Sequence, residues 1–324
     1  MIRTPPRPAR GFTLVEVLVV LGIVVLLVGL LAVGLQTAGR TARKTRELNT
    51  GRQIGLAWQQ YSSTYESRLL PGWIDVEVQE AWKVRYKDSG GDRVDPEFCR
   101  SYPWRLLPFL SYDFETLYGY LERDAATWSD EPALVSENPA FGLNAYYVGG
   151  WWEPFSSGPD VPLRGRPVFA SASYETADGR SLSGRLVNQT QESIKRPSQL
   201  IVFAASGYRE PGFYKEIAPS ASPGAAWVVP PRLGTQPVWE LSYGDQFQTL
   251  TVGSGMLASL AAAGIEVFQT QAVPVARHKQ TIASVRADLS TSNTGLGEMM
   301  DMAVWIDPAF SGTADGLNFT HTDE

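Results

Sequence analysis

The chain of 324 residues is poor in the residue types that build disulfides and metal sites. It has one cysteine, Cys99, and two histidines, His278 and His321. One cysteine cannot form an internal disulfide, and two histidines supply little material for a zinc site. No Gly-x-Gly-x-x-Gly, phosphate-binding loop or Cys-x-x-Cys motif occurs either. We therefore expect no cofactor and no bound metal.

Charge is also scarce, because charged residues make up 19% of the chain and the net charge is −6. Arg3, Arg7 and Arg10 are the only ionisable side chains among the first eleven residues, so the rest of the chain carries −9. Duplex binding depends on Lys and Arg neutralising phosphates, which excludes nucleic acid as the main partner. Apolar residues reach 44%, with 10 Trp and 13 Tyr, and this composition excludes a disordered chain.

A long apolar run lies near the amino terminus. Residues 17–35 contain nineteen consecutive positions without a charge, and about twenty apolar residues at 1.5 Å each cross a hydrocarbon core. Glu16 lies just before this run. A carboxylate entering lipid costs roughly 2.5 to 3.5 kcal/mol at a helix centre and less near an end, so it needs a partner.

The segment Arg10-Gly11-Phe12-Thr13-Leu14-Val15-Glu16, followed by the aliphatic run, resembles the class III signal of type IV prepilins and type II secretion pseudopilins. The resemblance implies that a prepilin peptidase cuts after Gly11 and that the new terminal amine of Phe12 is methylated. It also implies that Glu16 pairs with the terminal amine of a neighbouring subunit during assembly. The partners so implied are the peptidase, other pilin or pseudopilin subunits and the inner membrane.

The orientation in the membrane comes from this resemblance alone. Three arginines precede the apolar run, and four basic residues, Arg40, Arg43, Lys44 and Arg46, follow it, so charge bias does not decide the topology. The resemblance implies a single-pass inner-membrane protein with a cytoplasmic amino terminus. The body would then be periplasmic, or at the cell surface after assembly.

Two simpler interpretations of the amino terminus stay open. A secretory signal peptide would be cut at a small-residue site such as Ala32-Val33-Gly34, although its apolar region is normally 7 to 15 residues long. A plain membrane anchor would need no function for Glu16.

Beyond the membrane segment the apolar spacing stays helical. Ile54, Ala57, Trp58, Tyr61 and Tyr65 form a stripe, and Pro71-Gly72 ends the helix. We expect a leader over 1–11, a transmembrane helix over 12–35, its amphipathic continuation over 36–70 and a globular body over 71–324. The expected fold class is α+β and pilin-like, with the long helix packed on an antiparallel β-sheet and an enlarged β-rich carboxy-terminal body.

Within the body we expect short strands, a second helix over 104–120 and a loop over 290–297. The strands are expected at 74–78, 143–148, 200–204, 226–229, 238–241, 264–268, 281–285 and 303–306.

The body also resembles a large family of prepilin-type proteins that is abundant in planctomycetes and verrucomicrobia. The resemblance covers residues 48–57 and Arg68-Leu69-Leu70-Pro71, then Trp104-Arg105-Leu106-Leu107-Pro108 and Pro197-Ser198 before an apolar run. The family's His-x9-Asp-Gly motif is matched by His278 and Asp288, but Leu289 replaces its glycine. Because glycine permits a positive φ, this replacement predicts a different turn geometry.

The body offers two weaker hypotheses besides a non-enzymatic pilin-like subunit. The rings of Tyr146, Tyr147, Trp151 and Trp152 form a possible ligand platform for a glycan on a membrane-anchored binding module. A tethered hydrolase would combine His278 with Ser206 or Ser254, although the Gly-x-Ser-x-Gly motif does not occur. We expect no catalytic residues and no enzyme activity.

Overall fold

A computed structural model describes most of the chain. The ranges are 14–119, 132–158, 161–168, 172–175, 181–184, 186–208, 224–233, 236–243, 248–252, 272–277, 281–307, 309–311 and 318–319. The chain divides into two compact units, 1–45 and 46–324, and each is considered by itself.

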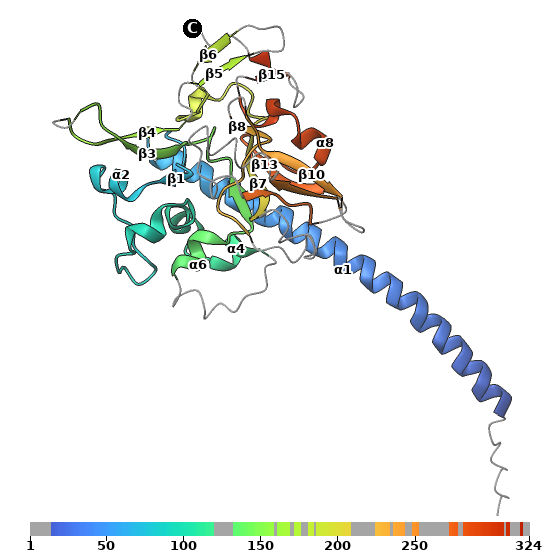
Figure 1. The fold of residues 1–324 in the computed structure, drawn as a ribbon. Coiled ribbons are helices and arrows are strands. Elements are labelled where there is room, and N and C mark those ends of the chain that lie inside the picture. The colour runs from blue at the N-terminus through green and yellow to red at the C-terminus, as the bar shows by residue number, and fades with distance from the viewer. Residues whose placement is uncertain are drawn as a thin grey trace, which may run out of the picture. The chain divides into compact units, whose positions relative to one another are not determined.

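Helix α1, Leu14–Thr64, runs without interruption and confirms the long helix expected at the amino terminus (Figure 1). From residue 47 onward one face is buried, at positions 47, 50, 51, 54, 55, 57, 58 and 62. This is the 3.6-residue period of an amphipathic helix. Tyr65 of the predicted stripe is exposed instead, because the helix ends at Thr64 and the chain turns through positive φ at Glu66 and Ser67.

The main sheet of the body has five strands and is antiparallel throughout. Its strands are β2 Phe141–Leu143, β7 Ile201–Tyr208, β12 Ala272–Pro274, β13 Thr281–Arg286 and β14 Thr291–Gly295. Strand β7 is central, since β2 and β12 pair with it along one edge and β13 pairs with it on the other. The residues from Ile201 to Ala205 are fully buried, as expected for a strand covered on both faces.

The buried half of α1 crosses this sheet at two glycines. A methyl group on Gly51 would lie 3.0 Å from Val285 Cγ2 and 3.1 Å from Phe141 Cζ. A methyl group on Gly55 would lie 2.9 Å from Val285 Cγ1. The absent side chains therefore allow the helix backbone to approach β2 and β13 closely, and the helix packs on an antiparallel sheet as predicted.

Smaller elements surround this framework. The helices are α2 Val76–Ala81, α3 Pro103–Leu106, α4 Phe114–Tyr118, α6 Pro132–Glu137 and α8 Leu296–Met299. Short 3₁₀ helices are Pro96–Cys99, Leu107–Leu110, Gln191–Ser193 and Met302–Val304. A three-stranded sheet contains β1 Trp73–Ile74, β3 Trp151–Phe155 and β4 Arg164–Pro167, with β1 parallel to β3. Four two-stranded pairs complete the described body: β5 Ala172–Glu175 with β6 Ser181–Gly184, β8 Arg232–Leu233 with β9 Gln236–Pro237, β10 Trp239–Tyr243 with β11 Gln248–Val252, and β15 Ala309–Ser311 with β16 Asn318–Phe319.

Several local predictions were wrong. The strand expected over 74–78 is mostly helix α2, the one over 303–306 overlaps a 3₁₀ turn, and the loop expected over 290–297 contains β14. The helix expected over 104–120 is broken, because Ser111 and Tyr112 adopt positive φ and Asp113 caps a new helix start. The strand expected over 264–268 lies outside the described residues.

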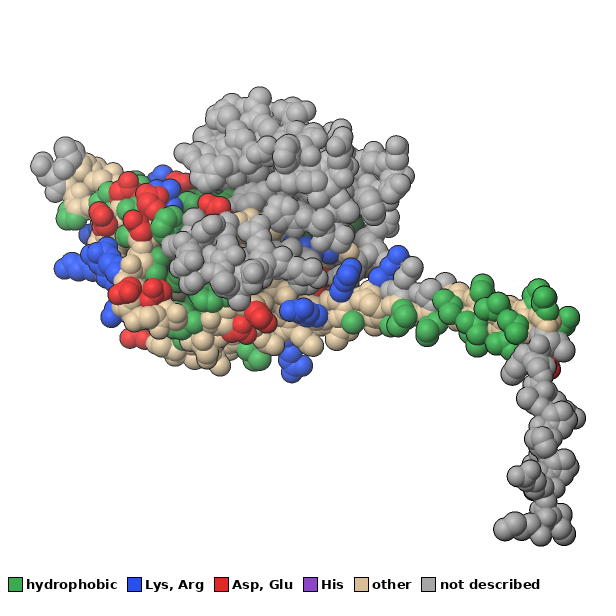
Figure 2. All heavy atoms as spheres, turned by 90° about the horizontal axis from the view of Figure 1, so that it is seen from below, with side chains coloured by type: hydrophobic (Ala, Val, Ile, Leu, Met, Phe, Trp, Pro, Cys, Tyr) green, Lys and Arg blue, Asp and Glu red, His purple; other side chains and the backbone are tan. Residues whose placement is uncertain are grey.

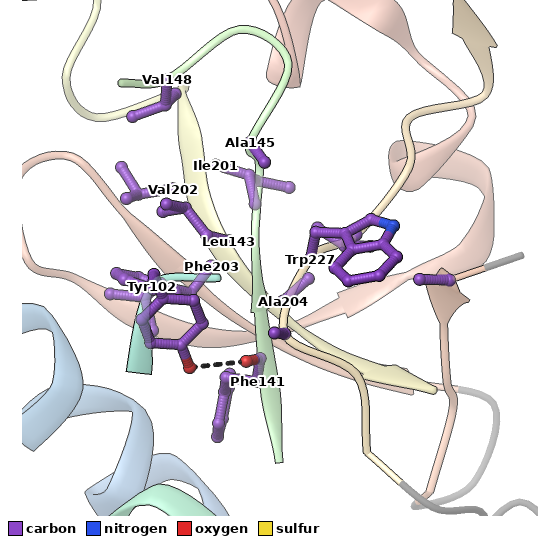
Figure 3. Close-up of a cluster of buried hydrophobic side chains, with 14 of the residues drawn as sticks. Tyr102, Phe141, Leu143, Ala145, Val148, Ile201, Val202, Phe203, Ala204 and Trp227 are labelled. Atoms are coloured by element: carbon purple, nitrogen blue, oxygen red, sulfur yellow. Dashed lines mark hydrogen bonds between the residues drawn. The ribbon is translucent and has the colours of Figure 1, made fainter. Parts of the chain in front are cut away.

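The core of the body joins these elements around β7. Figure 3 shows Tyr102 from the loop before α3 beside Phe203 of β7, with ring centroids 5.4 Å apart. The Tyr102 hydroxyl donates a 2.8 Å hydrogen bond to the carbonyl of Phe141. This contact ties the helical segment around Pro103 to the edge of the main sheet.

Candidate functional site

The amino-terminal part of α1 is apolar on every side. The segment Leu14–Leu31 is long and apolar enough to cross a membrane, and none of it is buried. Leu14 is 80% exposed, and even the most sheltered valines, Val17 and Val24, are 47% exposed. Figure 2 shows hydrophobic side chains, in green, along the length of this segment. A helix that is apolar all round needs lipid or other protein around it, which supports membrane anchoring.

Glu16 lies in the first turn of α1, as the third residue of the helix, and its side chain is exposed. A carboxylate in the first helical turn faces the positive end of the helix dipole and so is favoured there. Gly11 and Phe12, the predicted cleavage and methylation positions, lie outside the described residues. The structure therefore places the acid at the helix start and leaves its pairing with a terminal amine as a prediction.

A buried ion pair holds the carboxy-terminal half of α1 to the body. Arg277 Nη1 lies 3.4 Å from Glu47 Oε1, and both side chains are almost fully buried. The guanidinium also donates to the carbonyls of Ala140 at 3.1 Å and Ser206 at 2.7 Å. Burial lowers the pKa of Arg277, and the neighbouring Glu47 opposes that shift.

Sequence reasoning missed this pair. Glu47 lies seven residues before Ile54 on the buried stripe of α1, so an acid on an apolar helix face was a usable signal. Nothing in the sequence around Arg277 identifies it as the partner.

The predicted ligand platform is contradicted for three of its four rings. Tyr146, Tyr147 and Trp151 are at most 1% exposed. Trp151 stacks between Trp73 and Tyr146, with ring centroids 4.6 and 5.2 Å away. These rings form core because each large aromatic surface is covered by another, and no glycan can stack on them here.

Trp152 is only partly buried, but its indole already has neighbours. Its Nε1 donates to the carbonyl of Gly149 at 2.7 Å, and its ring contacts Trp82 edge-on at 5.0 Å. This single ring does not make the predicted four-residue surface.

Of the two residues that match the His-x9-Asp-Gly motif, the structure describes one. His278 lies outside the described residues, whereas Asp288 lies in the exposed turn between β13 and β14. The Asp288 carboxylate accepts from the backbone N–H and the hydroxyl of Ser290. Leu289 has φ +68°, so the different turn geometry predicted from its missing glycine was wrong: leucine takes the left-handed conformation that glycine would favour.

Other segments on which the resemblance to the planctomycete and verrucomicrobial prepilin-type family rests are hydrogen-bonded to one another. The Arg105 side chain is buried and donates to the carbonyls of Pro71 and Gly72 at 2.8 and 3.1 Å, at the segment that follows α1. The backbone N–H of Asp288 donates to the carbonyl of Pro197 at 3.0 Å. Residues that are far apart in sequence thus fix loop backbones together, and these described segments have a folding role.

Of the residues expected for a hydrolase site, the structure describes Ser206, and its side chain is part of the core. Ser206 is fully buried, and its hydroxyl donates to the carbonyl of Ala225 at 2.6 Å. Ser254 lies outside the described residues, as does His278. Among the residues that the structure describes, no group of three His, Cys, Asp or Glu side chains could hold a metal ion.

Comparison with known proteins bears on the amino terminus. Residues 6–32 match the family model for the prokaryotic N-terminal methylation motif. No curated protein and no solved structure matches the chain. The matched range contains Gly11, Phe12 and Glu16 together with most of the apolar part of α1. The chain therefore carries a prepilin-type methylation motif at its amino terminus, which supports a type IV pilin-like precursor of the kind that is processed and methylated.

Proposed function

We propose that the protein is a non-enzymatic pilin-like subunit that assembles through its amino-terminal helix into a pilus, a pseudopilus or a related envelope structure. One observation carries the proposal: the methylation motif at residues 6–32 coincides with the helical segment Leu14–Leu31, which is long and apolar enough to cross a membrane and of which nothing is buried. A membrane-inserted precursor needs that surface for lipid, and an assembled subunit uses the same surface against neighbouring helices.

In this proposal a prepilin peptidase cuts after Gly11 and methylates Phe12, and Glu16 then pairs with the amine of a neighbouring chain. The pairing removes the cost of a carboxylate at the lipid edge. The amino terminus is cytoplasmic and the body lies in the periplasm until assembly. Burial of the Ser206 hydroxyl and its bond to Ala225 support a body without a serine nucleophile at that position.

Cleavage is tested by mass spectrometry of the mature amino terminus. We expect a chain that begins at methylated Phe12. Gly11→Val should leave a precursor heavier by the leader, because a side chain beside the scissile carbonyl obstructs the approach that glycine allows. An intact leader in the wild type, or a chain cut after Gly34, would overturn the proposal.

Assembly is tested by cross-linking membrane-extracted wild type and Glu16→Leu. The variant should be processed and inserted but should not enter oligomers, since the terminal amine of its neighbour loses its partner. Glu80→Leu removes an exposed acid from α2 and is the matched control. Identical oligomer ladders for wild type and Glu16→Leu would favour a plain anchor over a pilin-like subunit.

A further inference from the structure

A basic cluster follows the apolar segment on the same helix. Arg40, Arg43 and Lys44 lie on α1, with both arginines exposed and the lysine half-buried. None of the three makes an ion pair with a residue that the structure describes. Residues 17–46 contain no Asp or Glu at all. The cluster is therefore a local excess of positive charge on a chain whose net charge is negative.

Helix geometry gathers the three side chains on one face. Positions i, i+3 and i+4 of an α-helix are neighbours, which places Arg43 and Lys44 beside Arg40 one turn further along. Each Cα–Cβ bond of a helix tilts toward its amino terminus. The three cations therefore lean toward the apolar segment rather than away from it.

The distance along the helix sets the depth of these cations in a bilayer. Arg40 is five residues beyond Leu35, which is about 7.5 Å along the helix axis at 1.5 Å per residue. Arg43 and Lys44 lie roughly 12 to 14 Å beyond Leu35. The headgroup layer on each side of a bilayer is about 5 to 7 Å thick. Long Arg and Lys side chains reach back toward it, and charges interact over about 8 Å at physiological ionic strength.

We propose that Arg40, Arg43 and Lys44 bind the phosphates of anionic phospholipid headgroups at the membrane surface on the body side. The inference rests on the proposed membrane span of α1, and it adds a lipid preference that the span alone does not require. Basic residues next to a transmembrane helix gain about 1 kcal/mol each near an anionic surface, which corresponds to about a fivefold preference per cation.

The test uses the full chain reconstituted into vesicles of phosphatidylcholine with 30% phosphatidylglycerol. Carbonate extraction first establishes insertion. The protein is then extracted in mild detergent, and co-purifying lipids are quantified by mass spectrometry. The ratio of phosphatidylglycerol to phosphatidylcholine that co-purifies with wild type should be about fivefold or more above the ratio in the vesicle, and 500 mM NaCl present during extraction should lower it.

The variant Arg40→Gln/Arg43→Gln/Lys44→Gln should insert normally, and its ratio of phosphatidylglycerol to phosphatidylcholine should fall about fivefold or more from that of wild type, back to the ratio in the vesicle. The matched control, Arg52→Gln/Arg85→Gln/Arg164→Gln, removes three exposed arginines of the body unit and should keep it. Failure of carbonate-resistant insertion would refute the membrane span instead, so the two failures are distinguishable.

Three results would overturn the lipid proposal. One is recovery of the two lipids by wild type in the same ratio as in the vesicle, with normal insertion. Another is a loss of enrichment in inorganic phosphate that exceeds the loss in NaCl at the same ionic strength, which would show a site for the free anion. The third is unchanged lipid recovery with loss of oligomer cross-links in the triple variant, which would assign the cations to an acidic surface of another subunit.

Discussion

The two halves of helix α1 have the same secondary structure and opposite relations to their surroundings. Between Val17 and Leu31 every side is apolar and nothing is buried, whereas from Glu47 onward one face is buried and the other is largely polar. Trp58 and Ile54 in the second half are fully buried, but Val24 in the first is 47% exposed.

This difference shows which surroundings stabilise each half of the helix. The second half is held by the sheet of its own chain, through Gly51 and Gly55 against Val285 and through the ion pair to Arg277. The segment Leu14–Leu31 of the first half is not buried, and a helix of this composition needs lipid or other subunits around it. Changes in the second half should therefore alter the stability of the body, and equivalent changes in the first should not.

Breaking the buried ion pair should have the largest effect. Glu47→Ala leaves the Arg277 guanidinium buried without its carboxylate, and removing one partner of such a pair costs about 3 to 5 kcal/mol of unfolding free energy. Denaturant unfolding of the detergent-solubilised chain measures it. Glu298→Ala, which breaks the exposed pair with Arg286, is the control and should cost less than about 1 kcal/mol.

The double variant Glu47→Leu/Arg277→Met sharpens this result. Replacing both charges by apolar side chains is often close to neutral, so the double variant should recover much of the lost stability. A double variant no more stable than Glu47→Ala would show that the hydrogen bonds of Arg277 to Ala140 and Ser206 contribute more to stability than the ion pair does.

Glycine-to-alanine substitutions should act differently in the two halves. Gly55→Ala places a methyl group 2.9 Å from Val285, and such overpacking costs about 1 to 3 kcal/mol. Gly29→Ala meets nothing within 4 Å and should leave the unfolding free energy of the body unchanged. Urea unfolding of both variants tests the contrast. A stabilised Gly55→Ala would mean that the helix can move away from β13 at little cost.

The sequence predicted the elements whose signals are local and strong. The long helix, β7 and β13 follow from apolar periodicity, and the signal at Gly11 to Glu16 is matched by the methylation motif. The aromatic run around Tyr146 was misread, because sequence does not show that Trp73 and Trp227, far away in the chain, cover those rings. Strand β14 was missed since Ser, Thr, Asn and Gly favour loops locally, and only pairing with β13 makes them extended.

Alkaline pH should test the buried core that supports the second half of α1. Burial raises the pKa of Tyr102 above its usual value of 10.0. The folded state keeps this proton while the unfolded chain loses it, so the stability is fully present below pH 10 and falls as pH rises toward the folded pKa. The slope from one such group is about 1.4 kcal/mol per pH unit.

Tyr102→Phe isolates this contribution. The variant loses the bond to the Phe141 carbonyl, which costs about 1 to 3 kcal/mol at neutral pH. Between pH 10 and 11.5 the unfolding free energy of the variant should then fall less steeply than that of the wild type, by about 1.4 kcal/mol per pH unit. Unfolding curves at several pH values measure both changes, and parallel slopes would show that the Tyr102 phenol ionises in the folded protein.

The smallest effect should come from Leu289, whose turn rests on the buried half of α1. Its left-handed conformation costs a leucine about 1 to 2 kcal/mol, yet its side chain packs 3.7 Å from the position of a methyl group on Gly55. Leu289→Gly relieves the strain but loses that packing and gains freedom in the unfolded chain, so it should be destabilised by less than about 1 kcal/mol.

Leu289→Ala keeps the strain and also loses the packing. Alanine should therefore be less stable than glycine at this position, although it retains more side chain. Denaturation midpoints of the two variants measure the order, and a glycine variant less stable than the alanine variant would show that the turn carries no strain.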